Sequence, residues 1–292
     1  MPRQPSPDAE AATPDARRRG LLWLGAAAAL AGCAAAPAPR APSALASVQV
    51  LPPLAMPGLG RDRALRLCLP PSYTQGERRY PVVYMHDGQN LFDDATSYAG
   101  EWGVDETMQE LARGGFEAIV VGIDNGGERR MAELNPWPLD KVGPGEGEAY
   151  LRFIVEVVKP WIDSRYRTRP EAAQTAMIGS SMGGLISHYA LHRHPAVFGL
   201  GGVLSPAYWT APAMFDYAAA HPLPATSRLM LHMGGREGGS MVPDVQRMHE
   251  LLAAHKEPAL QLRIVPQGEH NEAAWRQEFP RVVRWLYGLP AA

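Results

Sequence analysis

Alternation between short apolar runs and helical patterns constrains the fold of this chain more than any other feature of its sequence. Continuous apolar runs such as Ala118–Ile123 are typical of strands that are buried on both faces. Helical segments lie between such runs, as in Pro243–Lys256, where apolar residues recur at spacings of three and four. We therefore expect an α/β fold in which helices cover both faces of a mostly parallel sheet.

The predicted elements follow one another without an internal repeat or a second linker from residue 47 onward. No helix separates the first two predicted strands, so we expect them to start the sheet as an antiparallel pair. Strands are predicted at Arg63–Leu69, Tyr80–Tyr84, Ala118–Ile123, Thr175–Ile178, Leu200–Leu204, Leu229–Met233 and Leu260–Val265. Helices are predicted at Val104–Ala112, Tyr150–Tyr166, Met182–His194, Pro243–Lys256 and from Glu272 onward.

The N-terminal residues have the character of an export signal. Three arginines, Arg17-Arg18-Arg19, precede an apolar run, Leu21–Ala31, that is too short to span a bilayer and typical of a signal-peptide core. The run ends in Leu30-Ala31-Gly32-Cys33, which resembles a bacterial lipobox. We therefore expect a lipoprotein signal peptide over 1–32 and lipidation of Cys33; an ordinary secretory signal that is cut later is the alternative. The arginines fit either a twin-arginine signal or a plain arginine-rich segment.

The export signal predicts the arrangement of the rest of the chain. The Ala/Pro-rich residues 33–46 are expected to form a tether, and residues 47–292 one folded domain. The protein would then be exported, in the periplasm or at the cell surface, and would meet the membrane through its N-terminal lipid.

Composition and charge exclude several classes of function. The formal net charge of −2 is not that of a typical nucleic-acid-binding protein, and we do not expect a nucleic acid as partner. Two cysteines in 292 residues exclude a disulfide scaffold and a cysteine-rich zinc module. His86-Asp87 would suit a metal, but no third ligand follows at a sensible spacing, and a turn held by the side chains of Asp87 and Asn90 is favoured. We expect neither a metal nor a cofactor.

A candidate nucleophile lies where a predicted strand meets a predicted helix. Gly179-Ser180-Ser181-Met182-Gly183 directly follows the strand Thr175–Ile178 and opens the helix Met182–His194. Gly-x-Ser-x-Gly at such a turn is typical of a nucleophile elbow, whose small flanking residues allow a tight turn that exposes the serine. The N-terminus of the helix favours negative charge that develops beside it. Ser181 is therefore the predicted nucleophile.

A serine nucleophile needs a base and a group that orients the base. In folds built on this elbow, the chain order is serine, acid, histidine. His270 lies in a short loop after the last predicted strand and is the predicted base. Glu237 follows the strand Leu229–Met233 after two glycines and is favoured as the acid, with Asp244 as the alternative.

An oxyanion hole requires two backbone donors. Met182, the residue after the nucleophile, is expected to supply one of them. The other is expected from the loop after Tyr80–Tyr84, where Gln89 is assigned and Gly88 is the alternative.

Six segments also carry a resemblance to a known family. They are Tyr80–Asp93, Val121–Asn125 with Arg130 and Glu133 following, Lys159–Thr168, Ile178–Gly184, Leu204–Pro206 and Glu269–Trp275. In this order they resemble the "putative esterase" (esterase D-like) family of α/β-hydrolases, which includes enterochelin esterases, feruloyl and acetyl-xylan esterases, S-formylglutathione hydrolase and mycolyltransferases. The resemblance covers nearly all of residues 60–288. It implies an α/β-hydrolase fold with Ser181 as nucleophile, His270 as base and Glu237 as acid, although many relatives have Asp at the acid position.

The predicted function is the hydrolysis of a small-molecule or glycan-linked carboxylic ester through an acyl-enzyme. Trp102 and Trp209 lie in loops after strands, where an aromatic rim suits sugars and aryl groups, and Arg130 would meet an anionic group. Trp137 and Tyr208 are further rim candidates. Two alternatives stay open: an acyltransferase, in which an alcohol captures the same acyl-enzyme, and a non-catalytic, surface-anchored binding protein.

Overall fold

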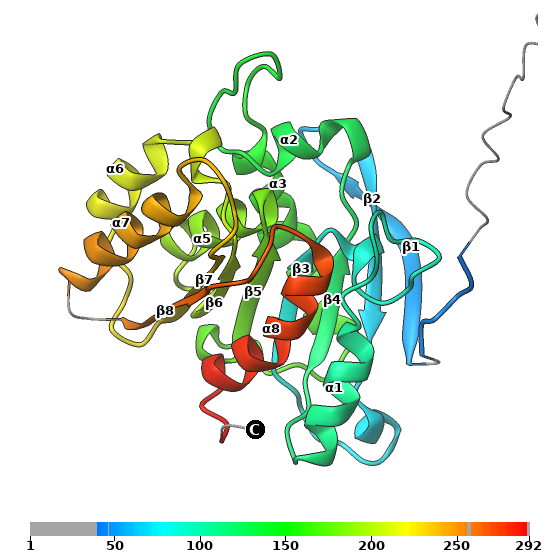
Figure 1. Ribbon diagram of the computed structural model, residues 1–292. Coiled ribbons are helices and arrows are strands. Elements are labelled where there is room, and N and C mark those ends of the chain that lie inside the picture. Colours follow the sequence, from blue (N-terminus) through cyan, green and yellow to red (C-terminus); the bar gives the residue numbers. More distant parts are fainter. Residues whose placement is uncertain (1–39, 46, 256–257, 291–292) are drawn as a thin grey trace, which may run out of the picture. The chain divides into compact units, whose positions relative to one another are not determined.

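An eight-stranded sheet forms the centre of the computed structural model, which describes residues 40–45, 47–255 and 258–290 (Figure 1). The strand order is β1-β2-β4-β3-β5-β6-β7-β8, and β4, β3, β5, β6, β7 and β8 run parallel. The strands are β1 (Val48–Met56), β2 (Arg61–Cys68), β3 (Val82–His86), β4 (Ile119–Ile123), β5 (Thr175–Ser180), β6 (Leu200–Leu204), β7 (Arg228–Gly234) and β8 (Ala259–Val265). The predicted signal peptide, Cys33 and the first part of the predicted tether lie outside the described residues.

The expected antiparallel pairing of the first two predicted strands is wrong. The first of them is β2, which pairs antiparallel with β1 and β4, whereas β3 pairs parallel with β4 and β5. The sequence pattern did not predict β1, because Pro52-Pro53 interrupt it, and the register of the β1–β2 ladder shifts between Leu51 and Leu54. Prolines are tolerated in β1 because it is an edge strand, where one row of backbone groups has no ladder partner.

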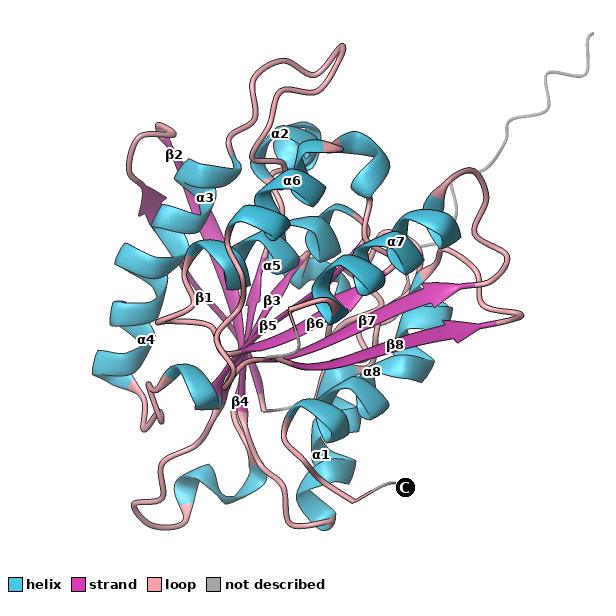
Figure 2. Ribbon diagram, turned by 90° about the vertical axis from the view of Figure 1, so that its left-hand side faces the viewer, coloured by secondary structure: helices cyan, strands magenta, loops and turns pink. Residues whose placement is uncertain are grey.

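Helices cover both faces of the sheet, as the sequence pattern predicts (Figure 2). Alternate strand residues point to opposite faces: Val82 and Tyr84 belong to one apolar core, and Val83 and Met85 to the other. The first core is covered by α3 (Gly147–Phe153), α4 (Lys159–Arg165), α5 (Met182–Arg193), α6 (Ala213–Ala220) and α7 (Met241–Ala253). The second is covered by α1 (Val104–Arg113) and α8 (Glu272–Leu286).

The carboxyl ends of the parallel strands all lie at the same end of the sheet, and the loops that follow them carry the candidate site. The nucleophile elbow follows β5, Ser205 follows β6, Glu237 follows β7 and His270 follows β8. The loop after β3 contains the short helix Gly88–Asn90, and the loop after β4 leads to α2 (Arg130–Glu133). Clefts outside the carboxyl ends of parallel strands are the common position for ligand sites in open α/β sheets.

Candidate active site

Ser181 lies on a strained turn between β5 and α5. Its backbone adopts φ 56° and ψ −120°, a conformation that residues other than glycine rarely occupy. The turn leaves no space for a side chain at Gly179, because a Cβ there would lie 2.5 Å from the carbonyl oxygen of Gly183. The Ser181 N–H donates to the carbonyl oxygen of Leu204 (3.0 Å), and the N–H of Ala207 donates to the Ser181 carbonyl oxygen (3.1 Å). The turn is therefore the expected elbow, and it is held against the end of β6.

His270 and Glu237, from different loops, form a hydrogen-bonded pair. His270 Nδ1 lies 2.7 Å from Glu237 Oε2. Asp244, the alternative acid, lies on α7 and accepts a hydrogen bond from Ser240 Oγ (2.5 Å). The structure thus brings Glu237, and not Asp244, to the histidine.

The carboxylate of Glu237 is buried and held in its charged form. Its Oε1 accepts hydrogen bonds from the Gly234 N–H (2.7 Å) and from Ser205 Oγ (2.6 Å). Burial alone would raise the pKa of Glu237, but hydrogen bonds from His270, Ser205 and the Gly234 N–H outweigh burial and lower the pKa below its ordinary value. The group is therefore an anion at neutral pH that can stabilise a protonated His270.

Two residues that the sequence analysis did not select support this pair. Ser205 has a positive φ of 45° and is fully buried after β6. Its Oγ donates to Glu237 and accepts a hydrogen bond from Trp275 Nε1–H (2.9 Å). The His270 ring stands edge-on to the Trp275 ring, with centroids 5.0 Å apart and an interplanar angle of 85°. Both residues belong to segments of the family resemblance, Leu204–Pro206 and Glu269–Trp275, which was the only signal for them in the sequence.

Met182 and Gln89, the predicted oxyanion donors, both lie in the first turn of a helix, where a backbone N–H has no acceptor within the helix. Gln89 lines the same cavity as Ser181. Gly88, the alternative donor, is a glycine for a packing reason: a Cβ would lie 2.9 Å from the backbone nitrogen of Asp124. Its lack of a side chain lets the turn lie against the end of β4. Gly88 is not among the residues that line the cavity, whereas Gln89 is.

Asp87 and Arg130 form a bidentate ion pair in the cavity wall. Arg130 Nε lies 2.6 Å from Asp87 Oδ1, Arg130 Nη2 lies 2.8 Å from Oδ2, and Asn125 Nδ2 donates to Oδ1 (2.7 Å). Burial would raise the pKa of Asp87, but the charge and hydrogen bonds of Arg130 lower it below its ordinary value. Most of the charge of Arg130 is thus compensated within the protein, by Asp87, whereas Arg130 was expected to meet an anionic group of the substrate. The described residues contain no cluster of potential metal ligands at His86-Asp87 or elsewhere.

The cavity at the elbow has a volume of about 910 Å³, and Ser181, His270, Gln89 and Arg130 all line it. Trp102 also lines it, buried against Trp275 with ring centroids 5.8 Å apart. Trp209 does not line this cavity; its side chain lies in the turn Tyr208–Thr210 and is 58% exposed.

The remaining rim candidates do not line the cavity either. Trp137 packs on Tyr189, and the hydroxyl of the buried Tyr208 contacts His188 Nδ1 (2.8 Å). Tyr98, which the sequence analysis passed over, lines the cavity with 89% of its surface exposed. Within the described part of the chain, none of the helices is sufficiently long and apolar to cross a bilayer.

Comparison with known proteins identifies the family to which this chain belongs. The sequence profile described as "Putative esterase" matches residues 57–286. The uncharacterized protein YbbA of Bacillus subtilis (strain 168) is 28% identical over 242 residues, which cover 78% of this chain and 93% of the relative. Siderophore triacetylfusarinine C esterase of Aspergillus fumigatus is 30% identical over 140 residues, 46% of each protein.

A solved structure shares the fold. The BES protein from Bacillus cereus superposes with a TM-score of 0.69 at 18% identity, over 83% of this chain and 95% of that one. The family profile spans most of the chain, and the sheet and its elbow follow the architecture that the resemblance implied. The chain therefore belongs to the "Putative esterase" family, a family of carboxylic ester hydrolases with the α/β-hydrolase fold.

Proposed function

We propose that this protein hydrolyses carboxylic esters through an acyl-enzyme on Ser181, with His270 as general base and Glu237 as the acid that orients it. The observation that carries the proposal is the hydrogen bond of 2.7 Å between His270 Nδ1 and the buried Glu237, in a cavity that Ser181 also lines. With Nδ1 donating to the carboxylate, Nε2 is unprotonated and free to accept a proton.

The steps follow from these positions. Ser181 Oγ attacks the ester carbonyl carbon while its proton passes to His270 Nε2, and Glu237 stabilises the imidazolium. The backbone N–H groups of Met182 and Gln89 donate to the oxyanion of the tetrahedral intermediate. Collapse of the intermediate breaks the bond to the alcohol, which leaves with the proton from His270. Water then attacks the acyl carbon while its proton passes to His270 Nε2. The bond between the acyl carbon and Ser181 Oγ breaks, Oγ takes the proton back from His270, and the carboxylic acid product is released.

Ser181→Ala tests the nucleophile. Ester turnover should fall by at least about three orders of magnitude, because only oxyanion stabilisation and binding are left. A fluorophosphonate probe should label the wild type at Ser181 and leave the variant unlabelled. Ser180→Ala is the matched control, since Ser180 lines the same cavity; it should keep the label. Retained turnover in purified Ser181→Ala would refute the assignment.

Two amide side chains beside the nucleophile support an oxygen-rich substrate. Gln89 Oε1 accepts the Asn125 N–H (3.0 Å), and Asn90 Oδ1 accepts the Tyr98 N–H (3.0 Å). Because a backbone N–H only donates, these bonds fix the amide orientation. Both residues line the cavity, and neither amino group has an acceptor among the residues that the structure describes. The wall thus presents donors, which suit an ester rich in carbonyl or hydroxyl oxygens.

One relative is named as an esterase of a siderophore, which supports the proposal of an oxygen-rich ester as substrate. A panel of esters that pairs each alkyl acyl group with an oxygen-bearing acyl group of equal length tests it, with rates normalised to alkaline hydrolysis. The normalised rates should favour the oxygen-bearing members; equal normalised rates throughout would count against the proposal.

Two alternative functions predict different products. An acyltransferase would give an ester when an acceptor alcohol is added, and a non-catalytic binding protein would leave the fluorophosphonate probe unreacted. The surface location is also a proposal, supported by the arginine cluster, the apolar run and Leu30-Ala31-Gly32-Cys33. Mass spectrometry of the mature N-terminus tests it: a lipidated Cys33 is expected, and an unmodified N-terminus beyond residue 33 would indicate ordinary secretion.

A further inference from the structure

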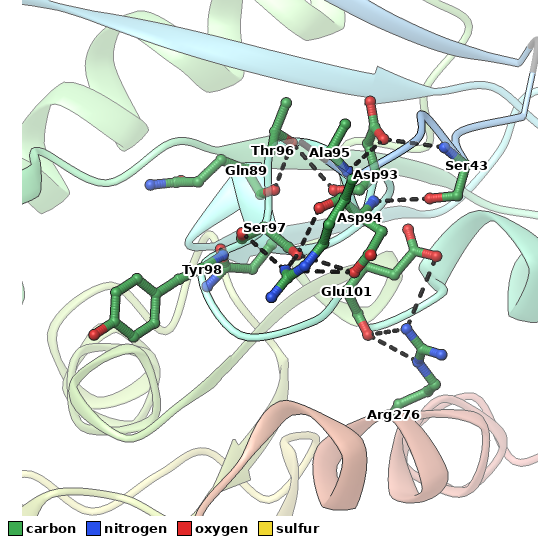
Figure 3. A network of polar contacts seen from close by, with 12 residues as sticks. Ser43, Gln89, Asp93, Asp94, Ala95, Thr96, Ser97, Tyr98, Glu101 and Arg276 are labelled. Carbon is green, nitrogen blue, oxygen red and sulfur yellow. Dashed lines mark hydrogen bonds and ion pairs between the residues drawn. The ribbon is translucent and has the colours of Figure 1, made fainter. Parts of the chain in front are cut away.

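Residues 40–45, which the sequence assigns to the tether, are hydrogen-bonded to the loop between the turn Gly88–Asn90 and α1. We call residues 40–45 the strap and residues 91–103 the pocket loop. Ser43 makes a reciprocal pair of bonds to this loop: its N–H donates to Asp93 Oδ1 (3.1 Å), and its Oγ accepts the Asp94 N–H (2.7 Å). Figure 3 shows Ser43 reaching the loop from the side opposite to Tyr98.

Both ends of the strap are attached as well. Arg40 Nη1 donates to Ser97 Oγ (3.0 Å) and lies 3.6 Å from Asp94 Oδ1. The Leu45 N–H donates to Asp105 Oδ2 (2.8 Å) at the start of α1. The contacts of Arg40 are largely exposed and individually weak, whereas those of Ser43 are partly buried. Ser43 is therefore the central attachment.

The pocket loop also forms one wall of the cavity. Thr96, Ser97, Tyr98, Ala99 and Trp102 line it together with Ser181 and His270. The same loop contacts the short helix Gly88–Asn90, which we call the oxyanion turn because it contains the proposed donor Gln89. The contact is a hydrogen bond of 2.8 Å from Thr96 Oγ1 to the Gln89 carbonyl oxygen.

The pocket loop reaches the histidine side of the cavity too. Arg276 Nε, on α8, donates to the Glu101 carbonyl oxygen (2.8 Å) (Figure 3). Thus the loop that the strap holds connects the wall beside the oxyanion turn with the helix after His270.

We propose that Ser43 is a positioning residue, through which the strap sets the position of the pocket loop and so the fit of a large substrate. The pocket loop contains no α-helix or strand before α1, so its conformation depends on such attachments. The effect on substrate rests on the proposed esterase function; the ordering of the loop does not.

The experiment compares Ser43→Ala with Ser43→Thr in the full chain. Ser43→Ala removes the acceptor of the Asp94 N–H, and Ser43→Thr keeps a hydroxyl there. For a bulky ester that reaches the pocket loop, KM should rise roughly three- to tenfold in Ser43→Ala, which is the range for one lost hydrogen bond. Values of kcat for 4-nitrophenyl acetate, a small ester that offers few contacts to the pocket loop, should stay within about twofold. Ser43→Thr should restore the KM.

A matched control and a second readout complete the test. Ser164→Ala removes a serine hydroxyl on the exposed surface of α4, outside the cavity, and should change neither constant. Amide hydrogen exchange should accelerate over residues 93–98 in Ser43→Ala alone. If the wild type hydrolyses no ester, the proposed function fails while hydrogen exchange still tests the strap. An unchanged KM with unchanged exchange would overturn the proposal, and so would an equal loss with the small and the bulky ester.

Discussion

Glutamine at position 237 would force the proposed base into the wrong tautomer. The amide has one oxygen and one amino group where the carboxylate has two oxygens. Oε1 receives the Gly234 N–H, which can only donate, so the amide oxygen must take that position. The amino group then faces His270 Nδ1, which must accept. The His270 proton consequently moves to Nε2, and that nitrogen can no longer take the proton of Ser181.

The size of the effect follows from what is kept and what is lost. Glu237→Gln keeps the oxygen for Gly234 and Ser205, so the fold should survive with a melting temperature within about 4 °C of the wild type. It loses both the correct tautomer and the negative charge that stabilises the imidazolium. We expect kcat/KM to fall about 10³- to 10⁴-fold, equivalent to about 4–5.5 kcal/mol of transition-state stabilisation.

The assay is steady-state hydrolysis of 4-nitrophenyl acetate, with thermal unfolding followed on the same preparations. Asp244→Asn is the matched control, because Asp244 pairs with Ser240 and not with the histidine; its kcat/KM should stay within about twofold. A loss below tenfold in a folded Glu237→Gln protein would refute the reasoning, since His270 would then keep the working tautomer without the carboxylate. Such a result would indicate a Ser181–His270 dyad.

Three further changes test the architecture around the site. Trp275→Phe removes the indole donor to Ser205 but keeps a ring beside His270, so kcat should fall about three- to tenfold with little change in KM. Gly179→Ala places a Cβ 2.5 Å from the Gly183 carbonyl oxygen, and differential scanning calorimetry should show a melting temperature lower by more than about 5 °C. Burial lowers the pKa of His192 to about 4, so between pH 6.5 and pH 4 the unfolded chain binds a proton that the folded chain does not. The contribution of His192 to the free energy of unfolding is therefore complete above pH 6.5 and is lost as the pH falls toward 4. Urea titrations should show a loss of roughly 3 kcal/mol from this group. His192→Gln should reduce that slope, and the part that is left should come from the other buried histidines whose pKa values burial lowers, such as His86 and His188.

The sequence by itself determined the parts of the protein that depend on local chain chemistry. The elbow is a contiguous motif, and Gly179 is required by a contact within it, because a Cβ there would lie 2.5 Å from the carbonyl oxygen of Gly183. The buried parallel strands were predictable because helices on both faces make them continuously apolar. His270 and Glu237 were selected as base and acid because each follows a recognisable strand in a fold with a known order of elements, and the structure places the two in hydrogen-bond contact.

Only the tertiary structure decided how distant segments meet. The strand β1 was not predicted because it contains Pro52 and Pro53, which a strand tolerates at the edge of a sheet. Arg130 was expected to meet an anionic group of the substrate, whereas the fold places Asp87 against it, 43 residues away in sequence. Trp209 had the composition and loop position of a rim residue, but its exposure depends on packing that no local pattern encodes.

The same holds for the groups that support the proposed catalytic residues. The contact between Ser205 and Trp275 spans 70 residues, and Ser43 reaches the pocket loop across 50. Hydrogen bonds of this range have no periodicity in the sequence, because the partners lie in loops and helices that meet only in the folded chain. The elbow can thus be predicted from a contiguous stretch of sequence, whereas the shape of the pocket around it depends on contacts that form only when the strands assemble.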